Sequence, residues 1–150
     1  MFKKLFVPSD DSDLTSMALL VSRMWFGLTM LFNHGFDKLV HFNDKVGTFP
    51  DPLGVGPEAG LILVIFAEVG ASLLLTAGFM TRIAASILVI DMFVAFLMVH
   101  KTTMTGPQGG ELAFLYLAGY VVLLIAGGGL FSLDTVLFSK PERSRIQKAD

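Results

Sequence analysis

Three ionisable residues lie inside long apolar stretches of the sequence: Arg23, Glu68 and Asp91. A charge at the centre of a bilayer costs roughly 2.5–3.5 kcal/mol on insertion scales, so each is a candidate functional group. Arginine can bind a carboxylate through two hydrogen bonds, and Arg23 could reach Glu68 in this way. Such a pair would either hold helices together or form a polar pocket for a quinone head group, a proton or a small anion.

Asp91 is left over by this pairing, because one cation cannot neutralise two acids. An ionised carboxylate without a partner is costly to bury. We therefore expect Asp91 to be protonated, to face a watery cavity, or to meet a partner on another subunit or protein. With Glu68 it could also serve as a proton relay.

A stripe of residues in the first apolar segment could line a polar track. Arg23, Gly27, Met30, His34 and Lys38 are spaced four, three, four and four residues apart, so they share one helical face. The spacing predicts an inward-facing track with room for close helix approach. The alternatives are that His34 bonds a backbone carbonyl near the helix end and that Lys38 extends to the membrane interface.

Four polar residues fall at the same level of the predicted helices and could form an outer pocket: His34, Lys38, His100 and Glu111. Glu111 follows two glycines and would equally suit a helix N-terminus. Two histidines and one carboxylate could bind a metal in principle. They lie on three helices without a short ligand spacing, so no metal site is predicted.

Apolar segments of membrane-spanning length carry these residues. About 20 residues cross the hydrocarbon core as a helix, and four segments qualify: 16–36, 59–79, 83–99 and 112–130. The short link between the second and third predicts an antiparallel hairpin. The sequence thus predicts an all-α membrane protein, an antiparallel four-helix bundle over residues 16–130. Residues 1–15 precede it, and residues 131–150 form a basic tail.

The composition supports a membrane protein. Hydrophobic residues make up 53% of the chain, charged residues 16%, and the mean hydropathy is +0.68. Soluble domains carry roughly 25% charged residues, so a soluble enzyme, a disordered chain and a disulfide scaffold are all disfavoured. The absence of cysteine excludes thiol chemistry, Fe–S ligation and cysteine-based zinc sites. A net charge of −2 gives no reason to expect a nucleic-acid partner.

Lysine and arginine predict the orientation of the bundle. Seven fall on one side of the predicted spans: Lys3, Lys4, Arg82, Lys140, Arg143, Arg145 and Lys148. Three fall on the other side: Lys38, Lys45 and Lys101. The side richer in these residues normally faces the cytoplasm. Both termini are therefore expected there.

The order of these motifs resembles the DoxX family of small bacterial membrane proteins over about residues 18–134. The similar pieces are Arg23 and Gly27 followed by His34–Leu39, then Ala67–Glu68 followed by Leu73–Leu75 and Gly78–Arg82, then Gly109–Glu111, and last Gly127–Gly129 leading to Ser132–Asp134. Asp91 lies outside this pattern. The resemblance implies a four-helix protein of the bacterial inner membrane, linked to quinone-coupled oxidation as a small or accessory oxidoreductase subunit.

The leading hypothesis is a quinone-interacting or accessory subunit of a membrane oxidoreductase system. Whether the chain itself is an enzyme stays open, because it shows no redox centre: no cysteine, dinucleotide fingerprint or clear haem ligand pair. No covalent cofactor is predicted, and electrons would pass through a bound quinone or a partner. One alternative is a small-molecule or proton-coupled carrier, which would have to form a homo-oligomer. The other is a scaffold that holds a soluble partner through its basic tail.

Overall fold

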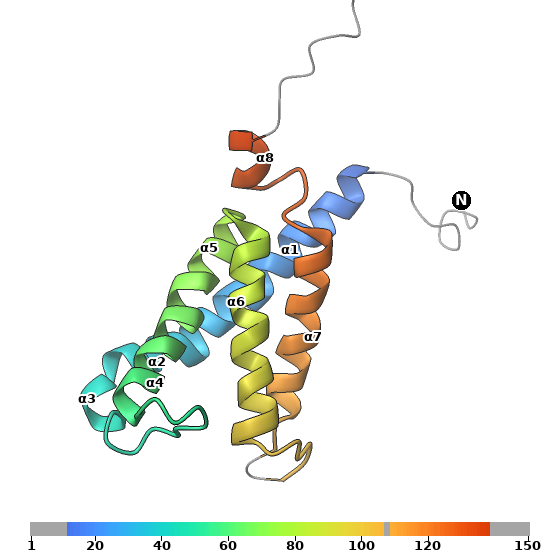
Figure 1. Ribbon diagram of the computed structural model, residues 1–150. Coiled ribbons are helices and arrows are strands. Elements are labelled where there is room, and N and C mark those ends of the chain that lie inside the picture. The colour runs from blue at the N-terminus through green and yellow to red at the C-terminus, as the bar shows by residue number, and fades with distance from the viewer. Residues whose placement is uncertain (1–11, 107–108, 139–150) are drawn as a thin grey trace, which may run out of the picture.

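A computed structural model describes residues 12–106 and 109–138, and all regular secondary structure in that part of the chain is helical (Figure 1). The first long helix consists of α1 (Ser12–Met30), a π-helical segment (Leu31–Gly35) and α2 (Phe36–Val40). The second consists of α4 (Pro57–Ile65), a π-helical segment (Phe66–Ala71) and α5 (Ser72–Ala77). The third consists of α6 (Thr81–Val94) and a π-helical segment (Ala95–Val99), and the fourth is α7 (Glu111–Ala126). Two short helices are α3 (Phe42–Lys45) and α8 (Leu133–Phe138).

Three of these helices are long and apolar enough to cross a membrane: Ser12–Val40, Pro57–Ala77 and Thr81–Val99. The chain therefore has the features of a multi-pass membrane protein. The first is 29 residues long, more than a bilayer requires, and it runs obliquely behind α6 in Figure 1. The fourth helix, α7, is apolar but has only 16 residues, because Gly127 ends it with a positive φ of 80°.

Two glycines set the antiparallel register of the first and second helices. A Cβ added to Gly27 would collide with Thr76 Oγ1, and one added to Gly35 would lie 2.8 Å from the backbone of Glu68. Moving eight residues forward in the first helix, from Gly27 to Gly35, moves the contact eight residues back in the second helix, from Thr76 to Glu68. Because the two helices touch closely at both positions, this register fixes which side chains can meet.

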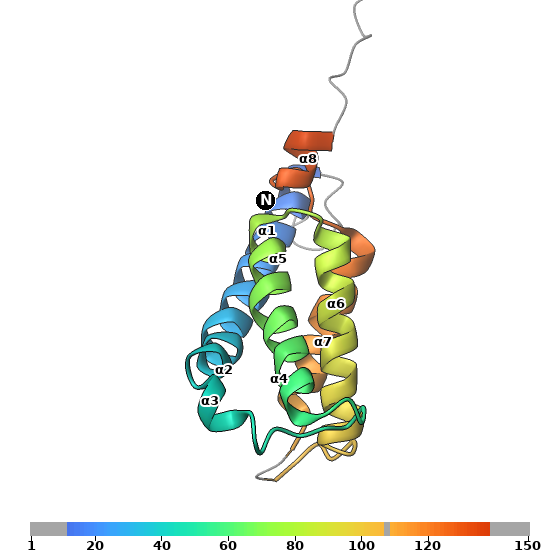
Figure 2. The ribbon, with the colours of Figure 1, turned by 60° about the vertical axis from the view of Figure 1, so that its left-hand side comes forward.

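A tight turn joins the second and third helices, as the short link predicts. Gly78 and Met80 both adopt left-handed conformations, with φ of 69° and 48°. Gly78 is required for a second reason, since a Cβ there would collide with the Arg23 guanidinium. The turn brings α5 and α6 side by side at one end of the molecule (Figure 2).

The core is small and lies mainly between α6 and α7. Ala84, Ala85 and Leu88 on α6 are fully buried, as are Tyr120 and Leu123 on α7. Large apolar side chains instead cover much of the outside, among them Trp25, Ile90 and Ile125, which are 69%, 64% and 73% exposed. A surface of this kind suits lipid contact, because the hydrophobic effect penalises it only in water.

Candidate functional site

Lys38 and Glu68 form an ion pair between the first and second helices. Lys38 Nζ donates to Glu68 Oε1 at 2.8 Å and to Oε2 at 2.7 Å. The Glu68 side chain is only 5% exposed, and that of Lys38 is 20% exposed. Each Glu68 oxygen thus has a charged donor within hydrogen-bond distance, which is the arrangement that makes burial of a carboxylate tolerable.

The local backbone explains how the two side chains meet. Glu68 lies in the π-helical segment Phe66–Ala71, and Lys38 follows the π-helical segment Leu31–Gly35 by one turn. A π-helical turn holds one more residue than an α-turn and often marks a functional site. Gly35 packs directly against the Glu68 backbone. The absence of a side chain at Gly35 therefore allows the close approach that places Lys38 over the Glu68 carboxylate.

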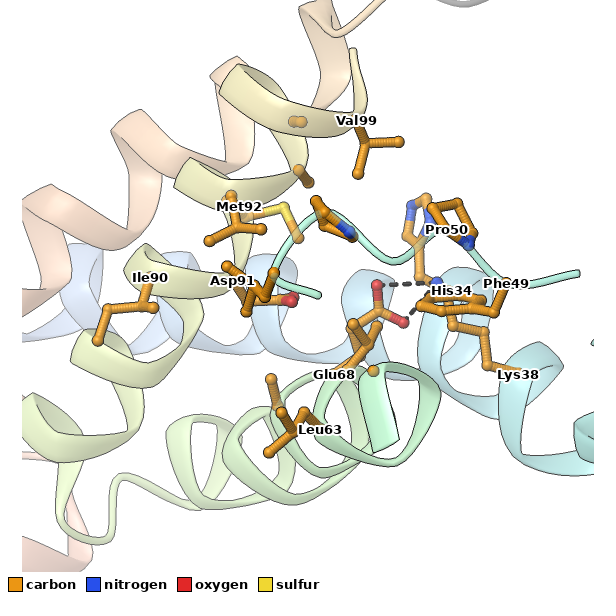
Figure 3. Close-up of a pocket in the computed structure, with 18 of the residues that line it drawn as sticks. His34, Lys38, Phe49, Pro50, Leu63, Glu68, Ile90, Asp91, Met92 and Val99 are labelled. Atoms are coloured by element: carbon orange, nitrogen blue, oxygen red, sulfur yellow. Dashed lines mark hydrogen bonds and ion pairs between the residues drawn. The ribbon is translucent and has the colours of Figure 1, made fainter. Parts of the chain in front are cut away.

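A cavity of about 700 Å³ opens beside this ion pair. Five of the seven ionisable candidates from the sequence line it: His34, Lys38, Glu68, Asp91 and His100. In Figure 3, Asp91 approaches from α6, Glu68 from the second helix, and His34 and Lys38 from the first helix. Most of the remaining lining is apolar, including Met30, Leu63, Ile87 and Met92. The cavity thus has a small polar region within apolar walls, which is typical of sites for amphipathic small molecules.

Asp91 brings to the cavity a carboxyl group with one oxygen that lacks a hydrogen-bond partner among the described residues. Its Oδ2 atom is buried and has no hydrogen-bond partner within residues 12–106 and 109–138. Asp91 lines the cavity, whereas its expected protonation, its contact with water and a partner on another protein stay predictions.

Tyr116 is a cavity residue that the sequence reasoning missed. Its ring meets the His34 imidazole edge to face at 5.7 Å and stacks on Tyr120 at 5.8 Å. The residues buried on α7 are Ala113, Tyr116, Tyr120 and Leu123, spaced three, four and three residues apart. This inward stripe is visible in the sequence and could have identified Tyr116.

The loop between α3 and α4 closes one side of the cavity, and its contribution was also missed. Phe49, Pro50, Leu53 and Val55 line the cavity from this loop. Asp51 stabilises the turn by accepting hydrogen bonds from the backbone N–H groups of Val55 and Gly56, both at 2.9 Å. In Figure 2 the loop passes across the ends of α4 and α6.

Arg23 does not pair with Glu68, so that expectation was wrong. It is fully buried at the other end of the bundle. Its guanidinium donates to the carbonyl oxygen of Phe131 at 2.7 Å and, at 3.5 Å, to those of Leu75 and Thr76. These carbonyls belong to the last turn of α5 and to the segment after α7. Arg23 therefore ties three parts of the chain together, which is a structural role.

Asp134 completes this junction from the segment after α7. Its carboxylate accepts hydrogen bonds from the backbone N–H groups of Met80 at 2.6 Å and Thr81 at 2.9 Å, so it caps the N-terminus of α6. Desolvation alone would raise the pKa of Asp134. The bonds from Thr81 and Met80 and the charge of Arg23 outweigh it and hold that pKa below its ordinary value.

Glu111 lies apart from the other candidates. It is exposed in the first turn of α7 and does not line the cavity. His100 does line the cavity, and it packs against Gly110, where an added Cβ would lie 2.8 Å from the His100 Cβ. The expected outer group of four is thus three cavity residues and one exposed acid. Among the described residues, no cluster of three histidine or acidic side chains could hold a metal ion.

Six of the basic residues used to predict the orientation and the basic tail lie outside the described ranges: Lys3, Lys4, Lys140, Arg143, Arg145 and Lys148. Within the predicted tail the structure does describe α8, a short helix that the sequence analysis did not anticipate.

Comparison with known proteins places the chain among its relatives. The family model for DoxX matches residues 18–101. An uncharacterized protein of Haemophilus influenzae is 32% identical over 120 residues, which cover 74% of this chain and 84% of that protein. No solved structure gives a significant match. The matched region contains the five ionisable candidates that line the cavity, whereas Tyr116 lies beyond it.

Proposed function

The chain belongs to the DoxX family of membrane proteins, and we propose that its cavity binds a lipid-soluble quinone on behalf of a membrane oxidoreductase system. The observation that carries the proposal is a cavity of about 700 Å³, apolar in its walls and polar at Lys38, Glu68, Asp91 and His34. Pockets for small molecules and cofactors commonly occupy roughly 300–1,000 Å³ and have this division between apolar walls and a few polar groups.

The chemistry of the lining suits a quinone head group. Such a head group is a flat ring with two oxygens, so it needs apolar surfaces for the ring and hydrogen-bonding groups for the oxygens. Tyr116 and Met92 offer surfaces of the first kind. His34 and Asp91 offer hydrogen-bonding groups that are not engaged in the Lys38–Glu68 pair. The resemblance to quinone-linked members of the family supports the same class of ligand.

An accessory role follows from what the side chains can do. Carboxyl, imidazole and ammonium groups can bind and orient a quinone, but electrons must come from a cofactor on a partner protein. We therefore propose a membrane or soluble oxidoreductase as the partner of this chain.

We also propose that α7 is the fourth span of an antiparallel bundle in the bacterial inner membrane. At 1.5 Å per residue its 16 residues extend about 24 Å, and the glycine-rich segments at both ends would complete the crossing. Its extensive packing against α6 supports this arrangement. The excess of lysine and arginine on one side supports cytoplasmic termini.

Filling the cavity tests the proposed function. Ala95 is a half-buried residue of the cavity wall, and Ala118 is an exposed residue of α7 outside it. The Ala95→Phe and Ala118→Phe variants would be placed in lipid nanodiscs and titrated with a decyl-tailed benzoquinone, with empty nanodiscs as the blank. We expect Ala95→Phe to weaken binding at least tenfold and Ala118→Phe to leave it unchanged.

Two results would overturn the proposal. One is a wild-type protein that takes up no more quinone than empty nanodiscs. The other is a folded Ala95→Phe variant, with a melting temperature like that of Ala118→Phe, that binds the quinone as tightly as the wild type does.

A further inference from the structure

We propose that Asp91 forms a hydrogen bond with a carbonyl oxygen of the bound quinone, and that the quinone enters from the bilayer between the second and third helices. This inference rests on the proposed function, and it adds a role for one residue and a route. Asp91 lies outside the motifs that carry the family resemblance, so the resemblance does not imply this role.

Asp91 carries a buried polar atom that has no partner at the cavity within the described part of the chain. Four buried side-chain polar atoms lack a hydrogen-bond partner among the described residues: Arg23 Nε, Ser72 Oγ, Thr81 Oγ1 and Asp91 Oδ2. Of these four atoms, only Asp91 Oδ2 belongs to a residue that lines the cavity. A buried polar atom without a partner is unfavourable, so a ligand that supplies the missing hydrogen bond is favoured at this position.

The surroundings of Asp91 determine the kind of group that it would bind. Among the described residues, Glu68 accepts two hydrogen bonds from Lys38, so the ammonium group at the cavity is already bound to an acid other than Asp91. A carboxyl group without its own cation is far less costly in an apolar wall when it carries a proton. In that form it can both donate and accept. It would therefore match a neutral carbonyl or hydroxyl oxygen better than an ammonium group.

Exposed side chains of the cavity wall indicate the route by which a ligand would enter. Leu63 and Phe66 on the second helix and Ile90 on α6 line the cavity, yet they are 53%, 60% and 64% exposed. Residues that are both exposed and part of the lining form the rim of the cavity, and Leu53 and Val55, 55% and 50% exposed, continue this rim along the loop before α4. Because the second and third helices are of membrane-spanning type, the part of the rim between them is the part that would face hydrocarbon. Ile90 is next to Asp91 in the chain, so a ligand head at Asp91 would leave its tail in the bilayer.

The test compares Asp91→Asn with Asp91→Leu in lipid nanodiscs. Asparagine keeps a donor and an acceptor, whereas leucine keeps the approximate size and neither. With the decyl-tailed benzoquinone we expect Asp91→Leu to bind about tenfold more weakly than the wild type and Asp91→Asn to remain within about threefold of it. Decylamine, with the same tail and a cationic head, should not compete with the quinone.

Infrared difference spectra provide a second readout that does not depend on how well Asp91→Leu folds. Adding the quinone to the wild type should shift a carboxyl C=O band that is missing in Asp91→Asn. The proposal is overturned if the difference spectra of the wild type and Asp91→Asn are identical in the carboxyl C=O region. It is also overturned if folded Asp91→Leu binds the quinone like the wild type, or if decylamine displaces the quinone.

Failure of this proposal is distinguishable from failure of the proposed function. If Asp91→Leu binds normally while Ala95→Phe does not, the quinone occupies the cavity without Asp91. If the wild type binds no quinone, both proposals fail together.

Discussion

Replacing Lys38 by methionine should destabilise the bundle strongly, because the substitution leaves a buried carboxylate without its cation. The Glu68 side chain is 5% exposed and loses two hydrogen bonds, of 2.7 and 2.8 Å. Removing one partner of a buried ion pair typically costs about 3–5 kcal/mol. We expect Lys38→Met to fall within that range.

The reverse substitution should cost less. Lys38 is 20% exposed, and without Glu68 its long side chain can carry the ammonium toward the membrane interface. Glu68→Met should therefore cost about 1–2 kcal/mol. Replacing both residues by methionine removes both charges and fills similar volume, which is often close to neutral. The double variant should lie within about 1 kcal/mol of the wild type, giving a coupling energy of about 3 kcal/mol or more.

A double-mutant cycle measures this coupling directly. Each protein would be unfolded reversibly in mixed micelles by increasing the fraction of denaturing detergent, with helix content followed by circular dichroism. The reasoning is refuted if Lys38→Met is within about 0.5 kcal/mol of the wild type. It is also refuted if the two single effects simply add in the double variant, since independent residues behave that way.

Three further predictions use other parts of the structure. Gly35→Ala should destabilise the bundle by about 1–3 kcal/mol in the same unfolding assay, because its Cβ would lie 2.8 Å from the Glu68 backbone. Gly47→Ala is the control, because a Cβ at Gly47 would have nothing within 4 Å. Equal effects of the two substitutions would contradict the close helix contact at Gly35. Asp134→Ala should cost about 1 kcal/mol through loss of the α6 cap. Because the pKa of Asp134 is lowered on folding, its contribution is complete above the unfolded-state pKa and disappears as the pH falls through the folded-state pKa. The melting temperature of the wild type should thus approach that of Asp134→Ala on acidification from pH 6, and a constant difference down to pH 2 would contradict the sign. A fluorescent protein fused to the C-terminus should fluoresce in the cytoplasm, whereas an alkaline phosphatase fusion that is active outside would reverse the proposed orientation.

The sequence was sufficient to predict features that depend on one helix at a time. The inward stripe through Gly27, Met30, His34 and Lys38 follows from spacing alone, and the structure buries or half-buries every member. Helical class and apolar length follow from composition in the same way. These features are local, so the period of 3.6 residues and the charge pattern determine them.

The pairing of charges could not be predicted, because it depends on the register between helices. Arg23 and Lys38 lie on the same face, and either could in principle reach Glu68. The contacts of Gly27 with Thr76 and of Gly35 with Glu68 place Glu68 opposite the outer end of the first helix. Arg23, four turns away, lies instead against the last turn of α5.

The cavity itself was beyond sequence reasoning for a related reason. The second and third helices contact each other mainly through α5 and the adjacent π-helical segment, whereas α4 and α6 lie apart. The cavity lies between α4 and α6, and the loop before α4 folds back over it. The π-helical turns at Glu68 and before Lys38 have no recognisable signal in composition.

Native mass spectrometry of the protein released directly from its own membrane tests the central claim most directly. We expect a bound species with the mass of a lipid-soluble quinone on the wild type and on Ala118→Phe, and its loss from Ala95→Phe. Quinone binding in the cavity is contradicted if the wild type carries no such species, or if Ala95→Phe, folded and inserted, carries it to the same extent.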